Sequence, residues 1–426
     1  MRAARANLAN PAAGNERIAV DGSLRGTRSV LDQRLAAELD RIRAANLYRV
    51  RRIVEGTHGA QITVDGKSCV NFCSNDYLGL AADPRLAEAA RKSLSISGTG
   101  SGAAALVSGY NVEHARLEEE LAQFVQRPRA LLFGSGWAAN LGVLRALLGK
   151  NDTLIADELN HASLIDGGRL SGARYVRASH CDAAAFGRAL TSIVPPLSKG
   201  GQGGFALVAT DSVFSMDGDL APLSALATLC RQHDAALMVD DAHGFGVAGA
   251  RGQGAVLDAA LSVDDAPVYV ATLGKALGCA GAFVAGSETL IEYLIQRARS
   301  WVFSTAPPPA IAAAARTALR IVRDEPERRT HLFENLRRFQ DGAAQLGIAL
   351  GASQTPIQPL ILGDEKRTLA LSQYLFARGL WVAAIRPPTV PPGTARLRIT
   401  LSAAHKDAQI DRLLDALAAG LKATAC

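Results

Sequence analysis

The sequence predicts an α/β protein with a large domain on a mostly parallel, doubly wound sheet and a smaller α+β domain after it. Short apolar strand patterns alternate with helical patterns from Ala130 to about Ser304, as in consecutive strand–turn–helix units. The proline run at 307–309 marks a boundary, and the tail beyond it mixes helices with further strands. A chain of 426 residues can bury the cores of two such domains.

Ahead of the large domain we expect a disordered extension at 1–28 and an N-terminal arm at 29–72. A helix is expected over 31–46, because its leucines and isoleucine recur at helical spacing. This apolar stripe consists of Leu31, Leu35, Leu39 and Ile42. Two short strands, at 62–64 and 70–72, flank the turn sequence Asp65-Gly66.

The large domain is expected over 73–306. Its first helix, over 84–96, has Pro84 at the first helical position after Asp83. A second helix, over 113–126, turns Leu117, Leu121 and Phe124 inward. Strands are expected at 130–133, 153–156, 174–176, 205–210, 236–239, 268–272 and 281–285. The glycine-rich segment 198–204 predicts a surface loop.

The small domain is expected over 307–426 and opens with one long helix at about 310–345. The remaining pattern predicts an α+β tail. Its strands are expected near 346–350, 359–362, 380–385 and 396–401, and its helices at 366–378 and 406–422.

The formal net charge is +6, and many arginines lie in the first fifty residues. This excess favours either a polyanionic ligand, such as a nucleotide or coenzyme A, or simply a solvated arginine-rich leader. Basic residues are not interleaved with aromatic ones, so we expect no nucleic-acid partner. The hydrophobic content of 48% is typical of a globular protein.

The six cysteines are scattered and none forms a C-x-x-C pair. This pattern predicts a reducing, cytoplasmic location and no metal site or disulfide framework. No apolar run approaches the roughly 18 residues of a membrane-spanning helix. Residues 1–28 lack the apolar core of a secretory signal, which leaves a transit peptide or a disordered extension.

Two strand ends carry the most informative residues. One predicted strand ends in Asp240-Asp241-Ala242-His243, and another ends in Thr272 and Lys275 with glycines on both sides. An ordinary lysine has a pKa of about 10.4, but burial lowers that pKa and makes imine formation practical. A lysine, an acid for a ring nitrogen and an imidazole are the groups that hold pyridoxal phosphate (PLP). A surface lysine in a turn is the alternative for Lys275.

The carboxylate of Asp240 follows a wholly apolar strand, where it needs a partner, and a pyridinium nitrogen is a suitable one. Capping the next turn is the alternative role, for which Asp241 is the better candidate. His243 could hydrogen-bond the cofactor's ring oxygen or be a structural histidine.

Three further turns could complete such a site. The turn Gly134-Ser135-Gly136-Trp137 joins a strand to a helix, where free N–H groups bind a phosphate. His161 follows the next strand and could stack on a flat ring. The segment 212–219 offers hydroxyls and acids, or is an Asx-turn loop. The glycines at 244–249 match G-x-G-x-x-G but lack the following helix, so no dinucleotide site is expected.

From about residue 31 to 420 the chain resembles the α-oxoamine synthases, which are fold-type-I PLP enzymes. It is most similar to the branch that acts in biotin biosynthesis. The segment 384–401 distinguishes this branch from its relatives, because those that use succinyl or acetyl thioesters tend to differ at 385–388. The resemblance rests on SNDYLGL (74–80), LVSGYNVEH (106–114), NHASL (160–164), VFSMDGDLAPL (213–223), VDDAHGFGV (239–247), TLGKALG (272–278) and AIRPPTVPPGTARLRITL (384–401).

The resemblance implies a role for each matching residue. Lys275 would be the Schiff-base lysine, Asp240 would pair the ring nitrogen, and His161 would stack on the ring. The other implied cofactor contacts are Ser215 and His243 at the ring oxygen, and Gly136, Trp137 and Thr272 at the phosphate. The implied substrate contacts are Arg386 for the amino-acid carboxylate, Thr389 in the acyl site, and Arg49 and Asn75 for the thioester or substrate.

The resemblance also implies an activity: condensation of L-alanine with pimeloyl-CoA, or with a pimeloyl carrier protein, and loss of carbon dioxide. The segment Phe303-Ser304-Thr305 resembles one that reaches a neighbouring subunit's phosphate, which implies a homodimer with sites at the interface. One alternative is a sister enzyme that uses glycine and a shorter acyl thioester. The other is a non-catalytic subunit, in which we would expect the Schiff-base lysine to be lost.

Overall fold

The computed structural model describes residues 29–193 and 204–424, which form two compact units divided between Arg51 and Arg52. The first unit contains helix α1 (Val30–Ala44), where the side chain of Ser29 accepts a hydrogen bond from the N–H of Asp32. None of its residues is buried: the three leucines of the predicted apolar stripe are exposed, and Ile42 is half-buried. The predicted extension at 1–28 lies outside the described residues, as does the predicted loop at 198–204 except for Gly204.

The second unit is built on a seven-stranded sheet in which every strand predicted between 130 and 285 is confirmed. Strand β10 is antiparallel to both of its neighbours, and the other neighbouring pairs are parallel. The predicted mostly parallel sheet is therefore confirmed. The spatial order is β4 (Arg129–Phe133), β10 (Ala282–Gly286), β9 (Val268–Thr272), β8 (Ala236–Asp240), β7 (Ala206–Asp211), β5 (Thr153–Asp157), β6 (Arg174–Ala178).

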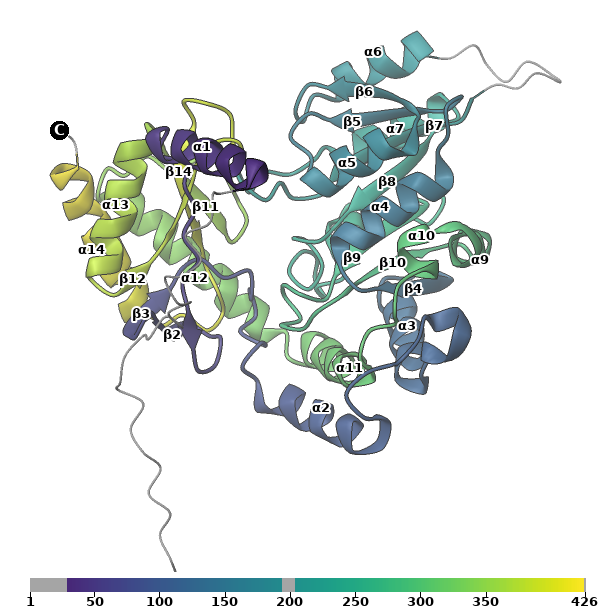
Figure 1. The fold of residues 1–426 in the computed structure, drawn as a ribbon, viewed down its shortest axis with the longest axis horizontal. Coiled ribbons are helices and arrows are strands. Elements are labelled where there is room, and N and C mark those ends of the chain that lie inside the picture. Colours follow the sequence, from purple (N-terminus) through teal and green to yellow (C-terminus); the bar gives the residue numbers. More distant parts are fainter. Residues whose placement is uncertain (1–28, 194–203, 425–426) are drawn as a thin grey trace, which may run out of the picture. The chain divides into compact units, whose positions relative to one another are not determined.

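Helices cover both faces of this sheet because its strands are apolar on both sides (Figure 1). In β7, Val208 points into one core cluster while Leu207 and Ala209 point into the other, as the two-residue strand period requires. The helices α4 (Gly136–Leu147), α5 (Ala162–Ser171) and α9 (Glu288–Arg297) contribute to one cluster. The other receives residues from α3 (Val112–Phe124), α6 (Ala183–Ile193), α7 (Leu223–Gln232) and α11 (Pro309–Asp324).

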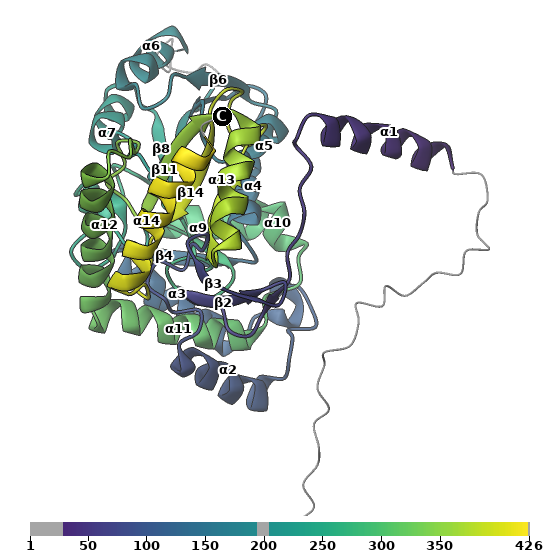
Figure 2. The same ribbon diagram turned by 90° about the vertical axis from the view of Figure 1, so that its left-hand side faces the viewer.

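Two smaller sheets complete the unit. In one, the predicted hairpin is confirmed, since Asp65 and Gly66 both have positive φ in the turn between β2 and β3. Helices α13 (Glu365–Ala377) and α14 (Asp407–Ala423) lie beside the other sheet, and α2 (Pro84–Ser97) lies against α11 (Figure 2). The sheet with the hairpin has the order β1 (Val54–Glu55), β2 (Gln61–Val64), β3 (Lys67–Asn71), β12 (Leu380–Trp381). The other sheet, beside α13 and α14, has the order β11 (Ile357–Gly363), β14 (Ala395–Thr400), β13 (Ala383–Ile385).

Three predictions about the tail were wrong. The single helix expected at 310–345 is two helices, α11 and α12 (Glu327–Gln345), because Pro326 disfavours helical geometry at Glu325, whose φ and ψ are −119° and 66°. The strand expected at 346–350 is absent from this described segment, where the chain turns through Gly347. The strand expected at 380–385 is two strands, since β12 pairs with β3 and β13 pairs with β14.

The other helices with predicted bounds are confirmed to within a few residues: those expected at 31–46, 84–96, 113–126, 366–378 and 406–422. In α2, Pro84 occupies the first turn and Asp83 caps the N–H of Arg85. Two short helices, α8 (Ala255–Asp258) and α10 (Arg299–Val302), and a π-helix, η1 (Ala105–Gly109), fill connections. Among the described residues, no helix is both long enough and apolar enough to span a bilayer.

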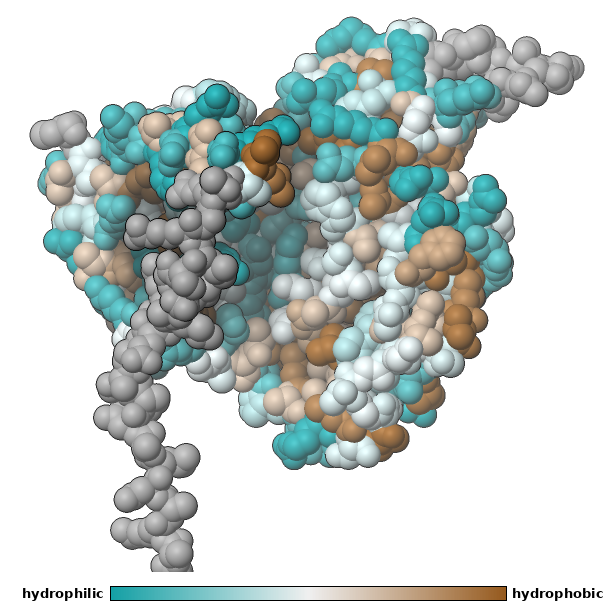
Figure 3. All heavy atoms as spheres, in the orientation of Figure 1, coloured by the Kyte–Doolittle hydropathy of each residue, from teal (hydrophilic) through white to brown (hydrophobic). Residues whose placement is uncertain are grey.

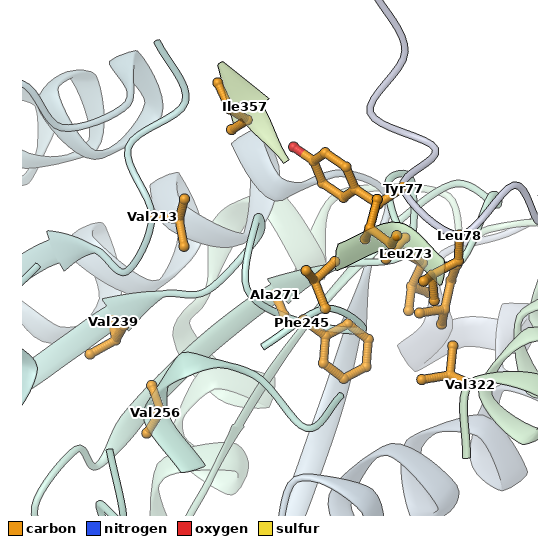
Figure 4. Close-up of a cluster of buried hydrophobic side chains, with 14 of the residues drawn as sticks. Tyr77, Leu78, Val213, Val239, Phe245, Val256, Ala271, Leu273, Val322 and Ile357 are labelled. Carbon is orange, nitrogen blue, oxygen red and sulfur yellow. The ribbon is translucent and has the colours of Figure 1, made fainter. Parts of the chain in front are cut away.

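A buried apolar cluster supports the segment that carries Lys275. Leu273, two residues before this lysine, packs with Phe245 and with Tyr77 and Leu78 of the SNDYLGL segment (Figure 4). Gly278 has a φ of 63°, and a side chain there would come within 2.3 Å of the Ala81 nitrogen. The lysine loop therefore lies tightly against the 77–81 segment, and only glycine suits this position.

Candidate active site

The carboxyl ends of four parallel strands bring the candidate residues to one edge of the large sheet. Strand β8 ends in Asp240, β7 ends in Asp211, β9 ends in Thr272, and His161 follows β5 by four residues. In open α/β sheets this edge is where ligands bind. Residues that are distant in sequence therefore meet at the position that the fold class predicts for a functional site.

Lys275 lies in the loop between β9 and β10, and its Nζ is 2.8 Å from the Nε2 of His243. Burial lowers the pKa of Lys275 to about 8, although the carboxylates of Asp240 and Asp211 favour the charged amine. The alternative of a surface lysine does not hold, because this amine is largely enclosed by protein. A substantial neutral fraction near physiological pH makes the amine a competent nucleophile.

His243 is a buried link between Lys275 and the N-terminal part of the unit. Its Nδ1 lies 2.6 Å from the hydroxyl of Tyr77, and its Nε2 faces Lys275. Burial, together with the charge of Lys275, lowers the pKa of His243 well below its usual value. The imidazole is therefore neutral, with one ring nitrogen able to accept a hydrogen bond and the other able to donate one.

Asp240 is buried, and both of its carboxylate oxygens have partners. Oδ2 accepts a 2.6 Å hydrogen bond from the side-chain amide of Asn140, and Oδ1 accepts one from the N–H of Ala242. The amide of Asn140 also donates to the hydroxyl of Ser163, while its own buried Oδ1 has no partner among the described residues. Asp240 thus lies at the centre of a polar cluster contributed by β8, α4 and α5.

Asp211 lies opposite Asp240 in the β7–β8 register. Its Oδ2 accepts a 2.6 Å hydrogen bond from the N–H of His161, and burial, aided by the charge of Asp240, raises the pKa of Asp211 well above its usual value. This contact fixes the backbone of His161, whose side chain caps α5. The ring of Trp137 meets the His161 ring edge-on, with centroids 6.2 Å apart.

Gly136 and Trp137 begin helix α4, as predicted from the strand–turn–helix pattern. Ser135 caps the helix by accepting a hydrogen bond from the N–H of Ala138. A side chain added at Gly134 or Gly136 would meet nothing within 4 Å, so the backbone of this turn faces open space. The first N–H groups of a helix have no partner within the helix. Where they face open space, they can bind a phosphate.

These observations fit PLP. The cofactor needs an enclosed amine, a carboxylate for its ring nitrogen and an anion site for its phosphate, and Lys275, Asp240 and the start of α4 provide one of each.

The hydroxyl of Thr272 donates to the carbonyl of Gly281 and accepts from the N–H of Gly274, so it braces the lysine loop.

A second buried cation, Arg398 of β14, reaches the same region. Its guanidinium donates to the Asn75 side-chain oxygen at 3.1 Å, to the Thr400 hydroxyl at 3.0 Å and to the backbone carbonyl of Ser215. The charge of Arg398 contributes to the lowered pKa of Lys275 after burial. Asn75 and Ser215, two predicted site residues, are therefore linked to each other through an arginine.

The other predicted substrate residues lie on two further segments. Arg386 and Thr389 lie on the turn between β13 and β14, where the Thr389 N–H donates to the Arg386 carbonyl. Arg49 belongs to the first compact unit.

The sequence analysis missed four members of the cluster: Asn140, Tyr77, Asp211 and Arg398. Each lies in or beside a motif that was singled out, but no periodicity indicates its partner. Asp241 also differs from its expected role as a turn cap, because its buried carboxylate accepts hydrogen bonds from Ser212 and Tyr269. The glycines at 244–249 form turns without an immediate helix, as predicted.

Comparison with known proteins follows this geometry. Residues 67–417 match the family described as aminotransferase class I and II. The 8-amino-7-oxononanoate synthase of Methylococcus capsulatus (strain Bath) is 56% identical over 90% of this chain and 97% of its own length. The enzyme of the same name from Pseudomonas putida KT2440 is 53% identical over 90% of this chain and 96% of its own length.

Solved structures agree in fold. A serine palmitoyltransferase from S. paucimobilis, solved with PLP and myriocin bound, has a TM-score of 0.86 and 28% identity, covering 93% of this chain and all of its own. The 8-amino-7-oxononanoate synthase of Francisella tularensis has a TM-score of 0.71 and 30% identity, covering 84% of this chain and 99% of its own.

Proposed function

The chain belongs to the class I and II aminotransferase family, within its 8-amino-7-oxononanoate synthase branch, and on that premise we propose its reaction and the residues that perform it. The protein is a PLP-dependent acyltransferase of biotin biosynthesis. It condenses L-alanine with a pimeloyl thioester and releases 8-amino-7-oxononanoate, carbon dioxide and the thiol. The observation that carries this assignment is a buried lysine of lowered pKa beside Asp240, in a chain 56% identical to such a synthase.

Bound PLP supplies an electron sink that stabilises negative charge at the α-carbon of the amino acid. Lys275 holds the cofactor covalently, and Asp240 keeps the ring nitrogen protonated, with Asn140 fixing the carboxylate through its 2.6 Å hydrogen bond. The start of α4 at Gly136 and Trp137 binds the phosphate, together with Thr272. His161 stacks on the ring, and Ser215 and His243 reach its oxygen.

Lys275 is also the group that moves protons. Its amine would remove the α-proton of alanine, and a pKa near 8 would let it accept and return a proton at neutral pH. Neutral His243 lies 2.8 Å away and orients the amine. Tyr77, at 2.6 Å from the other ring nitrogen, fixes the imidazole.

The substrate contacts are proposed from the family motifs. Arg386 binds the alanine carboxylate, Thr389 lines the acyl site, and Arg49 and Asn75 contact the thioester or substrate. Asn75 accepts a hydrogen bond from Arg398, so its side chain is oriented by the same guanidinium that braces Ser215.

We further propose that the protein is a cytoplasmic homodimer with active sites at the interface. Leu106, Val107 and Phe303 are exposed by 55%, 79% and 70%. They lie on adjoining segments, because Ala104 and Thr305 form a β-bridge. Figure 3 shows apolar residues on the side of the molecule that carries α3 and α10. An apolar surface of this kind is typical of a subunit contact.

The test is thiol release by the purified, PLP-loaded protein with pimeloyl-CoA and either L-alanine or glycine. We expect alanine-dependent release and a product with the mass of 8-amino-7-oxononanoate. The Lys275→Ala variant is the matched control and should be inactive. Turnover only with glycine and a short acyl-CoA would instead assign a sister activity, and parallel assays with a pimeloyl carrier protein decide which donor is used.

The proposed dimer is tested separately by light scattering after size-exclusion chromatography. The native protein should have twice the mass of one chain. The double variant Val107→Glu, Phe303→Glu should shift toward the monomer, and an unchanged dimer in that variant would place the contact elsewhere.

A further inference from the structure

A second cluster of chemically active side chains lies at the same edge of the sheet, on its β5–β6 side. Asp157 is the last residue of β5, and His180 and Cys181 follow β6, which pairs with β5 in parallel. Asp219 comes from the loop after β7. The proposed function uses none of these four side chains, and no short sequence motif connects them.

Their atoms are arranged around the imidazole of His180. Nδ1 lies 2.9 Å from Oδ1 of Asp157, and Nε2 lies 2.6 Å from Oδ2 of Asp219. The sulfur of Cys181 lies 3.7 Å from Nε2 and 4.0 Å from Oδ2 of Asp219. One donor atom from each of Asp157, His180 and Cys181 lies within 4.8 Å of the others.

Two observations indicate that this cluster is built for a cation. The Oδ1 atom of Asp219 is buried and has no hydrogen-bond partner among the described residues, although a buried polar atom is normally paired. The His180 ring also lies between the carboxylates of Asp157 and Asp219, which meet its two nitrogens at 2.9 and 2.6 Å. The two carboxylates thus stabilise positive charge between them.

We propose that Nε2 of His180, Sγ of Cys181 and Asp219 bind one Zn²⁺ ion, with water as the fourth ligand. Thiolate, imidazole and carboxylate are the donors that Zn²⁺ takes in proteins. Asp157 accepts the Nδ1–H of His180 and fixes the ring, as carboxylates beside zinc-bound histidines do. Its other oxygen accepts the Cys181 N–H at 2.8 Å, so one side chain positions both ligands.

The existing distances need only small changes. A tetrahedral zinc site with bonds of about 2.0–2.3 Å places its donor atoms roughly 3.5 Å apart. The two sulfur distances, 3.7 and 4.0 Å, are close to this spacing. The short contact between Nε2 and Asp219 opens by less than about 1 Å when the metal displaces the hydrogen that these atoms share. Binding also displaces the thiol hydrogen of Cys181.

The ion would tie the ends of β5 and β6 to the loop after β7. This edge also carries His161, which follows Asp157 by four residues, and Asp211 at the end of β7. The site therefore braces the segment that positions a residue proposed to stack on the cofactor. The scattered cysteines had predicted no metal site. Two adjacent ligands after β6 and a third after β7 form no pattern of the C-x-x-C kind, so the sequence carries no spacing signal for them.

Cobalt substitution tests the site. The PLP-loaded protein is treated with a chelator, dialysed and titrated with Co²⁺, and the spectrum before metal addition is subtracted. We expect one equivalent to produce a sulfur-to-cobalt charge-transfer band with visible bands of tetrahedral cobalt. Zn²⁺ should then abolish both. The assay measures metal binding and not turnover. A negative result therefore does not contradict the proposed acyl transfer, and an inactive enzyme does not contradict the proposed metal site.

Four variants separate this site from adventitious binding. Cys181→Ser and Asp219→Asn should lose the charge-transfer band, whereas Cys230→Ser, a control at a buried cysteine of α7, should keep it. Asp157→Asn should bind on the order of 10- to 100-fold more weakly, because it loses only the support of the ligands. A retained PLP absorption spectrum verifies folding in each variant. The absence of a band in the native protein, or its survival in Cys181→Ser, overturns the proposal.

Discussion

The side chains of Asn140 and Asp240 are joined by a 2.6 Å hydrogen bond, although the two residues are 100 positions apart. This bond links α4, whose first residues are proposed to hold the phosphate, to β8, whose carboxylate is proposed to hold the ring nitrogen. The two ends of the cofactor site are thereby held at a fixed separation.

Asn140→Ala should weaken PLP binding. A hydrogen bond to a charged group contributes about 1.5–3 kcal/mol, which corresponds to roughly 10- to 100-fold in affinity. PLP titration of the apoprotein, followed by absorbance, measures this loss. Ser163→Ala is the comparison, since it removes the other acceptor of the Asn140 amide and a 2.7 Å contact to His161 but leaves the bond to Asp240, so its loss of affinity should be smaller. Equal affinities for Asn140→Ala and the native protein would contradict the assigned role.

The attachment of PLP to the apoprotein should accelerate with pH around a midpoint near 8. Only the neutral amine attacks, and burial lowers the pKa of Lys275 to about 8 from an ordinary value of about 10.4. Stopped-flow absorbance across a pH series measures the midpoint. Asp240→Asn removes the charge that most favours the protonated amine, so its midpoint should be lower. A midpoint near 10 in the native protein would mean that the amine is solvated.

Arg386→Gln should raise the KM for L-alanine roughly 10- to 100-fold, with the absorbance of bound PLP unchanged, because a charged hydrogen-bonding partner of the carboxylate is lost. Arg398→Gln is the informative comparison. It breaks the contacts to Asn75 and Ser215 and should therefore change both the KM and the spectrum of the bound cofactor. If only Arg398→Gln raised the KM, the alanine carboxylate would be assigned to Arg398 instead.

Asp241 should make the protein less stable as the pH rises from about 4 to about 7. Burial raises its pKa to about 7, so the folded state holds a proton that the unfolded state has already lost above its ordinary value. This contribution to stability is present below about pH 4 and is lost as the pH passes the folded-state pKa.

Asp241→Asn removes this titration, so its urea-unfolding midpoint should vary less with pH over the same range. Asp415→Asn, at an exposed position of α14, is the control and should follow the native protein. Parallel pH profiles for the native protein and Asp241→Asn would show that the carboxylate does not bind a proton on folding.

The sequence by itself determined the strands of the large sheet, the helices between them and the motifs at their ends. These features depend on local periodicity and turn chemistry, which each segment carries within itself. The break at Pro326 was equally local and was overlooked in a long helical pattern. Lys275 and Asp240 could be proposed as site residues because each lies at or just beyond the end of an apolar strand.

Only the tertiary structure decided which polar groups meet. Arg398 and Asn75 are 323 residues apart, and His180 and Asp219 are joined across 39 residues. No spacing rule predicts such pairs, because strand order and register place them. The same geometry sets burial, and burial rather than residue type gives Lys275 its lowered pKa and leaves an oxygen of Asp219 without a partner in the part of the chain that the structure describes.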